Sequence, residues 1–326
     1  MVHLLFTKPL VQYVAEIARQ AGIARVIVVV GHDADEVRRT LGEGFEYALQ
    51  QPQLGTAHAL MAARPLLAGF HGDVVVFVGD APLLSPAVVR QLVEKRRARQ
   101  LAATLLTAVF EKRVPPYGRI LRDAHGRVTG IVEEKDATPE QKKIAEVNVS
   151  LYCFDAPTVL PLLDEIRNAN ASGEFYLTDI AGILHRHGLH VDTLAADDPR
   201  FILGVNNRFD LVEVFKAMRE RIIDRHLANG VTILDPANTY VDDSVEIEPD
   251  AVILPFTFLQ QNSRIGRSCR IGPFVRLSNT RVAPECEIQF SNIEDRDIEP
   301  PGRKITFENF SAVVEQMHNP QMRAHE

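Results

Sequence analysis

The sequence is poor in the features that mark several classes of protein. Its 326 residues contain three cysteines, Cys153, Cys269 and Cys286, which are too few and too widely spaced for a disulfide framework or a zinc site. The net charge of -7 argues against general nucleic-acid binding, which needs a concentrated basic surface. No apolar run approaches the roughly 20 residues of a membrane span. We therefore expect a protein of the reducing cytoplasm, with neither nucleic acid nor membrane among its partners.

A strand and a glycine-rich turn are also missing from the start of the sequence. The first recognisable element is a helix-like run at residues 8–18, and a strand-like apolar run at 26–30 follows it. An α/β nucleotide-binding domain normally opens with a strand and a glycine-rich turn, whose amides hold phosphates at the start of the first helix. Neither precedes Lys8, so we expect the sequence as given to lack that phosphate-binding turn.

Strands and helices alternate up to about residue 230. The continuous apolar run at 74–78 is typical of a parallel strand covered on both faces, and Ser85 is placed to cap a helix that runs to about Gln100. Further strands are expected at 101–109, 149–154 and 190–194, and a long helix at 208–227. This alternation predicts a mostly parallel, doubly wound α/β domain over residues 1–229.

A six-residue repeat follows. Aliphatic side chains recur every six residues, at Val241, Ile247, Ile253, Leu259, Ile265, Ile271 and Leu277. A period of six fits neither a helix nor a sandwich strand, and is typical of a parallel β-helix in which one aliphatic residue per unit points into the axial core. The spacing shifts by one residue after Leu277, and we expect the coil to span 230–292. Residues 293–326 are predicted to be a polar tail with a capping helix at 310–317.

Asp80 directly follows the apolar strand at 74–78. A carboxylate at the carboxyl end of a central strand lies where ligands bind in open α/β sheets, and it can hold Mg²⁺ that also engages substrate phosphates. A Gly-Asp pair after a strand is also typical of a solvated turn, so this residue alone does not decide between the two.

Gln50, Gly55 and Thr56 open another expected helix. An amide side chain can pair with both edges of a base, and a glycine lets the backbone approach a ligand closely. Thr56 can instead be a helix N-cap. Polar groups also stand beside strand ends in the segments 117–120, 133–135, 146–148, 173–179 and 204–208, where each can be a turn or a cap. Their order is more informative than any one of them.

That order resembles the uridylyltransferase part of the bifunctional N-acetylglucosamine-1-phosphate uridylyltransferase/glucosamine-1-phosphate acetyltransferase family. The resemblance runs from about His3 to Leu277 and is carried by the motifs QLGTAHA, VGDAPLL, YGRI, GIVEEKDAT, GEFYLTD and GVNNR. Other sugar nucleotidyltransferases share the fold but not this whole set. The resemblance implies a Rossmann-like nucleotidyltransferase domain followed by a short left-handed parallel β-helix.

The resemblance also implies a role for each matching position. Asp80 and Asn206 match a pair that binds Mg²⁺, and Gln50, Gly55 and Thr56 match positions around the uracil. The positions that match the sugar-phosphate pocket are Gly118, Glu133, Asn148, Glu174, Tyr176 and Thr178. The implied reaction is attack by a phosphate oxygen of N-acetylglucosamine 1-phosphate on the α-phosphorus of UTP, which gives UDP-N-acetylglucosamine and pyrophosphate. Such a transfer needs aligned substrates and neutralised charge more than covalent help.

The sequence departs from the family pattern in three places. The opening strand, the loop of the form LAAGxGTRM and the lysine of the following PK pair have no counterpart, which would leave two half-sheets without their shared hydrogen-bonding partner. Val149-Ser150 stands where the family has Thr-Gly. No histidine occurs between His226 and His318, whereas acetyl transfer needs an imidazole base. We therefore expect no acetyltransferase activity, and a coil that serves to form a homotrimer.

Two explanations of the missing loop remain open. Either Met1 is an internal methionine and the natural protein carries about 25 more residues, or the chain is a non-catalytic sugar-nucleotide-binding or regulatory relative. We favour the first, because the metal and sugar motifs are all present. A hexapeptide acyltransferase is a third hypothesis, which the histidine gap disfavours. We expect the sequence as given to show little turnover.

Overall fold

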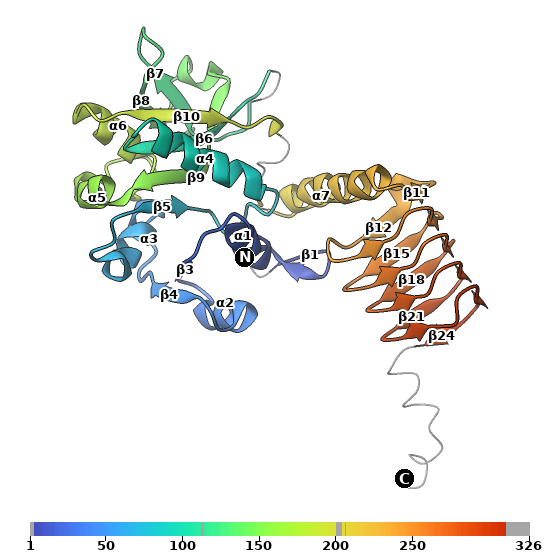
Figure 1. The fold of residues 1–326 in the computed structure, drawn as a ribbon. Coiled ribbons are helices and arrows are strands. Elements are labelled where there is room, and N and C mark those ends of the chain that lie inside the picture. The colour runs from blue at the N-terminus through green and yellow to red at the C-terminus, as the bar shows by residue number, and fades with distance from the viewer. Residues whose placement is uncertain (1–2, 112–113, 200–203, 206, 311–326) are drawn as a thin grey trace. The chain divides into compact units, whose positions relative to one another are not determined.

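The computed structural model describes residues 3–111, 114–199, 204–205 and 207–310 (Figure 1). The chain divides into two compact units, Met1–Val214 and Phe215–Glu326. Their boundary falls inside helix α7 (Arg208–Ala228), whereas the sequence suggested 229/230. The second half of this helix belongs with the coil because it bonds to the segment that leads into it: Arg219 donates to the Ala237 carbonyl over 2.7 Å.

The first unit alternates strands and helices along the chain. Its strands and helices are β1 (Leu4–Leu5), β2 (Lys8–Pro9), α1 (Leu10–Gln20), β3 (Ile27–Val30), α2 (Ala34–Leu41), β4 (Glu46–Leu49), α3 (Thr56–Ala63), β5 (Asp73–Val76), α4 (Pro86–Ala98), β6 (Ala103–Val109), β7 (Arg119–Arg122), β8 (Val128–Val132), β9 (Glu146–Asp155), α5 (Ala156–Val159), α6 (Asp179–Arg186) and β10 (Val191–Ala195). Helix α4 begins at the predicted cap, since the Ser85 hydroxyl accepts a hydrogen bond from the Val88 N–H over 3.2 Å.

The main sheet is mixed rather than mostly parallel. Its strand order is β10-β6-β9-β7-β8, with β5 also paired to β9. Strand β10 runs parallel to β6, but β9 runs antiparallel to β5, β6 and β7. The expectation of a mostly parallel sheet is wrong at this point because β9 is reached through the β7–β8 hairpin and not through a crossover helix.

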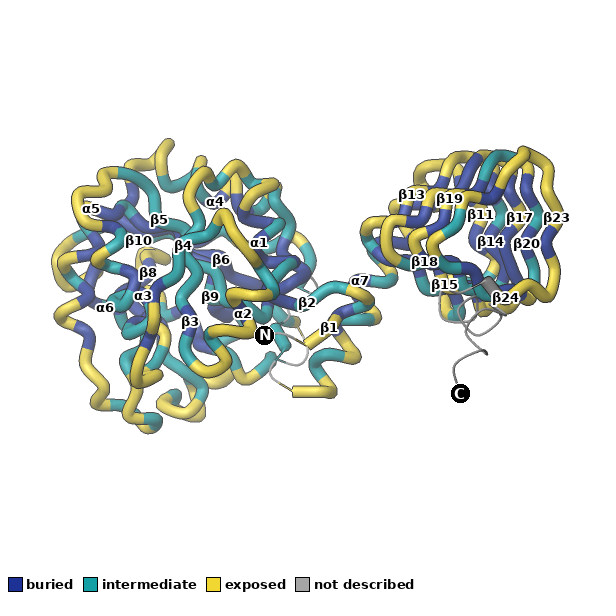
Figure 2. The backbone as a smooth tube through the Cα atoms, turned by 90° about the horizontal axis from the view of Figure 1, so that it is seen from below, coloured by how far each residue is buried: buried dark blue, intermediate teal, exposed yellow. Residues whose placement is uncertain are grey.

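Helices cover both faces of this sheet. Along β9, Leu151 and Cys153 face a cluster that includes Val89 and Leu92 of α4. The alternate residues of β9 face the opposite cluster, which includes residues of α3, α5 and α6. Figure 2 shows the buried backbone concentrated between these layers. The predicted doubly wound α/β class is confirmed.

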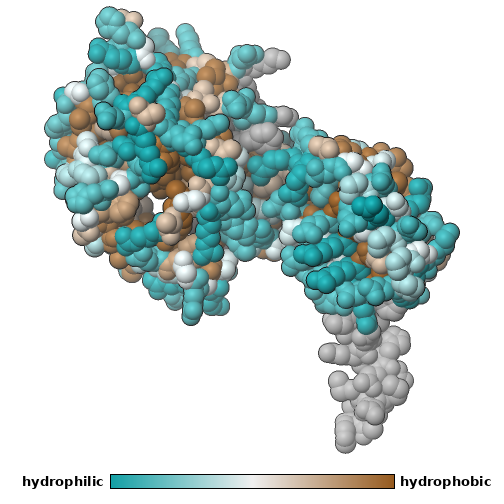
Figure 3. Space-filling model, viewed as in Figure 1, coloured by the Kyte–Doolittle hydropathy of each residue, from teal (hydrophilic) through white to brown (hydrophobic). Residues whose placement is uncertain are grey.

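Strands β3 and β4 form a separate parallel pair, and β5 has β9 as its one partner among the described strands. The open edges of β3 and β5, together with the apolar faces of α1 and α3, line one cavity of about 590 Å³. Figure 3 shows a hollow surrounded by apolar side chains in this unit. The two half-sheets expected without their shared partner are therefore present, with an apolar space between their edges.

The second unit is a left-handed parallel β-helix. Its short strands are β11 (Thr232–Ile233), β12 (Thr239–Val241), β13 (Glu246–Ile247), β14 (Val252–Ile253), β15 (Thr257–Gln260), β16 (Arg264–Ile265), β17 (Arg270–Ile271), β18 (Val275–Ser278), β19 (Arg281–Val282), β20 (Glu287–Gln289), β21 (Asn292–Glu294), β22 (Asp297–Ile298), β23 (Lys304–Thr306) and β24 (Asn309–Phe310). They form three parallel sheets, β11-β14-β17-β20-β23, β12-β15-β18-β21-β24 and β13-β16-β19-β22. The repeat aliphatics are buried along the axis, as predicted.

The coil continues beyond residue 292, where the sequence suggested its end. Strands β22, β23 and β24 pair with β19, β20 and β21 and carry the three sheets on to Phe310. Ile253 pairs with Ile271 three units on, and Ile271 pairs with Ile288 one residue short of three units. One turn between two strands of the coil is a residue shorter, while the aliphatic side chains stay stacked. The shift in spacing after Leu277 therefore marks a shorter turn and not the end of the coil. The predicted helix at 310–317 lies outside the described residues except for Phe310, which is in β24.

Among the described residues, no helix is both long and apolar enough to cross a membrane.

Candidate functional site

Asp80 lies just beyond β5, as predicted. Its carbonyl accepts a hydrogen bond from the Val205 N–H over 3.0 Å, and a Cβ built on Gly204 would lie 3.6 Å from its carboxyl oxygens. The VGDAPLL and GVNNR motifs therefore meet at this strand end. Burial raises the pKa of Asp80, and repulsion from Asp210 raises it further. Asn206, the other predicted metal ligand, lies outside the described residues.

Asp210 was missed by the sequence analysis. It lies in the first turn of α7, where Asn207 holds it: the Asn207 amide nitrogen donates to the Asp210 carboxylate over 3.0 Å. The Asn207 side-chain oxygen accepts from the backbone N–H groups of Phe209 and Asp210, which makes Asn207 the helix cap that the sequence left as an alternative. A carboxylate three residues after this cap was the available signal.

Asp80 and Asp210 are suited to a hard divalent cation. Both are oxygen donors, and their mutual repulsion in a half-buried setting is relieved by a positive charge. Tyr117 is close to the same pair: burial raises the pKa of its hydroxyl, and the charges of Asp210 and Asp80 add to the rise. The described residues contain no group of three or more His, Cys, Asp or Glu that could hold a metal. Magnesium usually takes one or two carboxylates plus substrate phosphates, so the pair fits it.

Two motifs far apart in the sequence are joined at Gly55. The Phe175 N–H donates to the Leu54 carbonyl over 2.7 Å, and the Ala57 N–H donates to the Phe175 carbonyl over 2.9 Å. Gly55 has φ +112°, and a Cβ there would lie 2.6 Å from the Phe175 oxygen. Only glycine fits this position, because the second loop occupies the space that a side chain needs. The close approach that the sequence assigned to a ligand is made here by the protein's own backbone.

Gln50 and Thr56 stabilise the same loop. The Gln50 amide nitrogen donates to the Gly55 carbonyl over 2.9 Å and lies 3.2 Å from His58 Nδ1. The Thr56 hydroxyl accepts from the Leu177 N–H over 3.0 Å. Thr56 is the first residue of α3, and the cap position belongs to Gly55, so the N-cap alternative for Thr56 is wrong. Both side chains also line the cavity between β3 and β5, and their contact with a base stays a prediction.

Gly118, Glu133, Asn148 and Thr178 come together in a second group. The Asn148 N–H donates to the Gly118 carbonyl over 2.8 Å, and a Cβ on Gly118 would lie 3.2 Å from a carboxylate oxygen of Glu133. Burial raises the pKa of Glu133, and the nearby side chain of Thr178 lowers it by less. A half-buried carboxylate beside a buried amide is a surface that sugar hydroxyl groups can bind.

Glu174 and Tyr176 lie on either side of Phe175, whose backbone bonds to the loop of Gly55. Glu174 is exposed, and its backbone is held by Asn170, whose amide nitrogen donates to the Glu174 carbonyl over 2.6 Å. Tyr176 is half-buried and accepts a backbone hydrogen bond from Asp179 over 3.2 Å. Their assignment to a sugar pocket stays a prediction.

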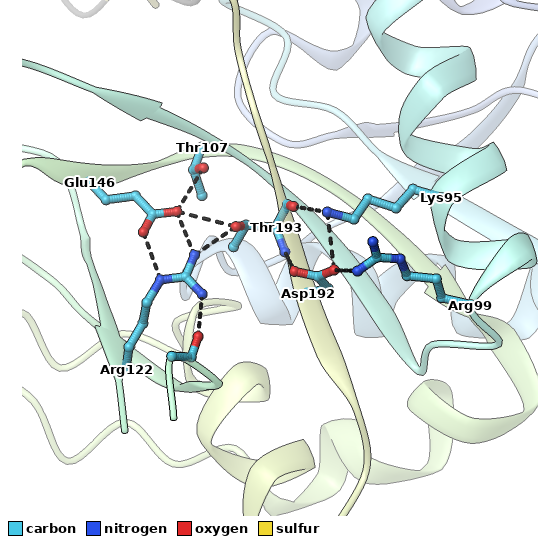
Figure 4. A network of polar contacts seen from close by, with 8 residues as sticks. Lys95, Arg99, Thr107, Arg122, Glu146, Asp192 and Thr193 are labelled. Atoms are coloured by element: carbon cyan, nitrogen blue, oxygen red, sulfur yellow. Dashed lines mark hydrogen bonds and ion pairs between the residues drawn. The ribbon is translucent and has the colours of Figure 1, made fainter. Parts of the chain in front are cut away.

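Glu146, two residues before Asn148 in the sequence, has a structural role. Arg122 binds its carboxylate at 2.7 and 2.8 Å, and Thr107 and Thr193 donate to it over 3.0 and 3.2 Å (Figure 4). Burial alone would raise the pKa of Glu146, but these partners, Arg122 foremost, leave it below its ordinary value. The network ties β6, β7, β9 and β10 together beside the Asn148 group.

Comparison with known proteins now places the chain. The model of the nucleotidyl transferase family matches residues 1–198. The chain belongs to this family. Within it, the "Bifunctional protein GlmU" of Brevibacillus brevis is 42% identical over 299 residues, which are 92% of this chain and 65% of that protein. The GlmU of Geobacillus sp. (strain WCH70) is 41% identical over 313 residues, covering 96% of this chain and 67% of that protein. The resemblance to the bifunctional uridylyltransferase/acetyltransferase family, here called the GlmU family, is confirmed.

The chain spans about 65% of the length of the Brevibacillus relative. Among solved structures, a UDP-glucose pyrophosphorylase complexed with UDP-glucose superposes with a TM-score of 0.54 at 17% identity, over 68% of this chain and 90% of that one. At this identity the likeness shows the fold alone. It agrees with the layered α/β architecture of the first unit.

Proposed function

We propose that this GlmU-family chain is built for transfer of UMP from UTP to N-acetylglucosamine 1-phosphate. The observation that carries the proposal is the convergence of the motifs: QLGTAHA bonds to GEFYLTD, GVNNR bonds to VGDAPLL, and YGRI lies against the glutamate of GIVEEKDAT. The first two pairs join segments far apart in the chain, and the third joins the two strands of the β7–β8 hairpin. Gln50 and Asp80 follow the carboxyl ends of β4 and β5, where α/β folds bind their ligands.

The chain's own residues act in this proposal by binding and orienting. Asp80, Asp210 and Asn206 would hold Mg²⁺, which supplies positive charge to the phosphates. The Glu133 carboxylate and the Asn148 carboxamide bind sugar hydroxyl groups and align the sugar 1-phosphate. The loop of Gln50 and Gly55, stabilised by the Phe175 backbone, forms the wall of the base site. Alignment of two substrates and neutralisation of their charge account for most of the rate enhancement in such transfers.

A non-catalytic sugar-nucleotide binder is the second candidate. The cavity of about 590 Å³ between β3 and β5 favours it, because this space reaches Asp80, Gln50 and Thr56 and separates the two half-sheets that carry the binding loops. Such a chain would bind the product and release no pyrophosphate. We also infer that it carries out no acetyl transfer, since no histidine lies between His226 and His318. Homotrimer formation through the coil and residence in the cytoplasm remain proposals.

The two candidates differ in turnover and agree in binding. The experiment measures pyrophosphate release from UTP and N-acetylglucosamine 1-phosphate with Mg²⁺, and binding of UDP-N-acetylglucosamine by calorimetry. We expect micromolar to millimolar binding in the presence of Mg²⁺, with a low but measurable Mg²⁺-dependent release of pyrophosphate. Binding with no release above the protein-free background would favour the second candidate. Release without measurable binding of the product, or neither activity, would contradict the proposal.

The metal assignment is tested with Asp80→Asn, which keeps the shape and removes the charge. We expect at least a tenfold loss in binding of UDP-N-acetylglucosamine and in any Mg²⁺-dependent release, with thermal stability unchanged or increased, because the like-charge repulsion with Asp210 is removed. Asp164→Asn is the control, since Asp164 is an exposed partner of Arg64 away from this site. If binding of UDP-N-acetylglucosamine and release of pyrophosphate depended on Mg²⁺ equally in both variants, the metal assignment would be refuted.

A further inference from the structure

Strand β9 contains a bulge between two buried polar residues. Its register with β6 places Asn148 opposite Thr107 and Tyr152 opposite Leu105. Two steps along β6 therefore correspond to four steps along β9. Two steps of a strand cover about 7 Å and four cover about 13 Å. The bulge shortens the distance between Asn148 and Tyr152 enough for their side chains to meet.

Ser150 lies at the centre of the bulge in the left-handed region, with φ +60°. This is the position where the family has glycine, which adopts such a φ without strain. Serine is strained there, because its Cβ crowds the backbone in the left-handed region. The chain thus keeps the bulge conformation although its residue disfavours it.

The bulge orients the Asn148 carboxamide. The Ser150 N–H donates to the Asn148 side-chain oxygen over 3.3 Å, and the Asn148 amide nitrogen donates to the Tyr152 hydroxyl over 2.7 Å. A backbone N–H can only donate, so it holds the oxygen on its own side and turns the nitrogen toward Tyr152. A weaker contact of 3.4 Å joins the same nitrogen to the Ser150 hydroxyl.

Tyr152 is a rigid support for this contact. It is 2% exposed, Asn148 is 3% exposed, and the Tyr152 ring stacks on Phe154 with a centroid distance of 5.5 Å. Ser150 and Tyr152 line the cavity that also reaches Asp80, while the Asn148 backbone is bonded to Gly118. The bulge therefore borders the cavity through Ser150 and Tyr152, and the Gly118–Glu133 group through the Asn148 backbone.

We propose that Tyr152 is a positioning residue for the sugar 1-phosphate half of the site, acting through the orientation of the Asn148 carboxamide in the Ser150 bulge. This inference rests on the proposed function. Tyr152 does not touch the substrate; it holds the amide in the one orientation in which the second lone pair of its oxygen is directed to the sugar. Without the hydroxyl, the amide can rotate, and the sugar must order it on binding.

The test compares two ligands that share the nucleotide and differ in the sugar. Calorimetry measures the Kd of UDP-N-acetylglucosamine and of UMP for the wild-type chain and for Tyr152→Phe. We expect the Kd of UDP-N-acetylglucosamine to rise about tenfold, as for the loss of one ordered hydrogen bond, and the Kd of UMP to stay within about twofold. In an Asn148→Ala background, Tyr152→Phe should change neither Kd, because the group that it orients is gone.

Tyr13→Phe is the matched control. Tyr13 is also buried, and its hydroxyl donates to the Leu5 carbonyl over 3.1 Å, so the change removes the same group from another part of the unit. Similar thermal destabilisation of both variants, with the UDP-N-acetylglucosamine effect confined to Tyr152→Phe, supports positioning. Equal Kd values for wild type and Tyr152→Phe overturn it, as does an equal effect on UMP. A wild-type chain that binds neither ligand overturns the proposed function, and this inference with it.

The variant Ser150→Gly distinguishes the contribution of the Ser150 hydroxyl from that of the bulge conformation. Glycine keeps the left-handed conformation and loses only the contact of 3.4 Å, so we expect the Kd of UDP-N-acetylglucosamine to stay within about twofold. A loss as large as that of Tyr152→Phe would assign the orienting role to Ser150 and overturn the assignment to Tyr152.

Discussion

Gly55→Ala tests the contact between the two motif loops that forms the base side of the site. A Cβ at this position would lie 2.6 Å from the Phe175 oxygen and 2.9 Å from its nitrogen. An ordinary contact is about 3.5 Å, so the loops must separate by nearly 1 Å. That movement weakens the hydrogen bonds from Phe175 to Leu54 and from Ala57 to Phe175.

The size of the effect follows from two terms. The backbone of Gly55, at φ +112° and ψ 178°, lies in a region that only glycine occupies readily, which costs an alanine about 1–3 kcal/mol. Overpacking against fixed backbone adds about 1–3 kcal/mol. The loops share part of this strain by moving, so we expect the free energy of unfolding to fall by about 2–4 kcal/mol.

Gly126→Ala is the control for backbone strain alone. Gly126 has φ +78° in the β7–β8 turn, and a Cβ there would meet no atom within 4 Å. We expect a loss of about 1 kcal/mol. Urea unfolding followed by tyrosine fluorescence reports the first unit, because five of the six tyrosines, all except Tyr240, lie in it. The Gly55→Ala midpoint should fall by about 1 M relative to wild type. Equal midpoints for the two variants would refute the close approach of the loops.

Two further predictions concern the coil unit. His226 is 4% exposed, neither ring nitrogen has a hydrogen-bond partner among the described residues, and burial, aided by Arg225, lowers its pKa to about 4. Because the folded pKa lies below the unfolded one, the stability of the coil unit is full above about pH 6.5 and falls as the pH drops toward 4, by about 2 kcal/mol at pH 4.5. In urea titrations followed by circular dichroism, His226→Phe should lose this dependence of stability on pH. An unchanged dependence would contradict the argument. Ile271→Ala removes a fully buried axial side chain and should lower the free energy of unfolding by about 3 kcal/mol in the same assay. Replacement of its exposed neighbour, Arg270→Ala, should change that free energy by less than about 0.5 kcal/mol. Equal losses in the two variants would argue against the stacked core.

The coil was the most predictable part of the molecule. One aliphatic residue every six is a local pattern, and each residue's inward direction follows from its place in its own unit. The end of the coil was not predictable in the same way. Strands pair across whole turns, so Ile271 can pair with Ile288 although a corner is one residue shorter. Counting along the sequence shows the one-residue shift after Leu277, but it does not show that the strands still pair across it.

The candidate site was predictable as a set of residues and not as a set of contacts. Gly55 was expected to admit a ligand, yet its missing side chain admits the Phe175 backbone. Gln50 was expected to pair with a base; its amide nitrogen is bonded to the Gly55 carbonyl of its own loop, and its contact with a base stays a prediction. The charge of Asp210 raises the pKa of Asp80; in the sequence, only its place three residues after the cap residue Asn207 marks it.

The sequence by itself determined the alternating α/β unit, the coil and the order of the motifs, because these are properties of short segments read one after another. Only the tertiary structure decided that β9 runs antiparallel, that its bulge brings Tyr152 to Asn148, and that the edges of β3 and β5 enclose an apolar space. Those features depend on which distant segments share a hydrogen bond or a volume, and that choice is made by packing the whole chain at once.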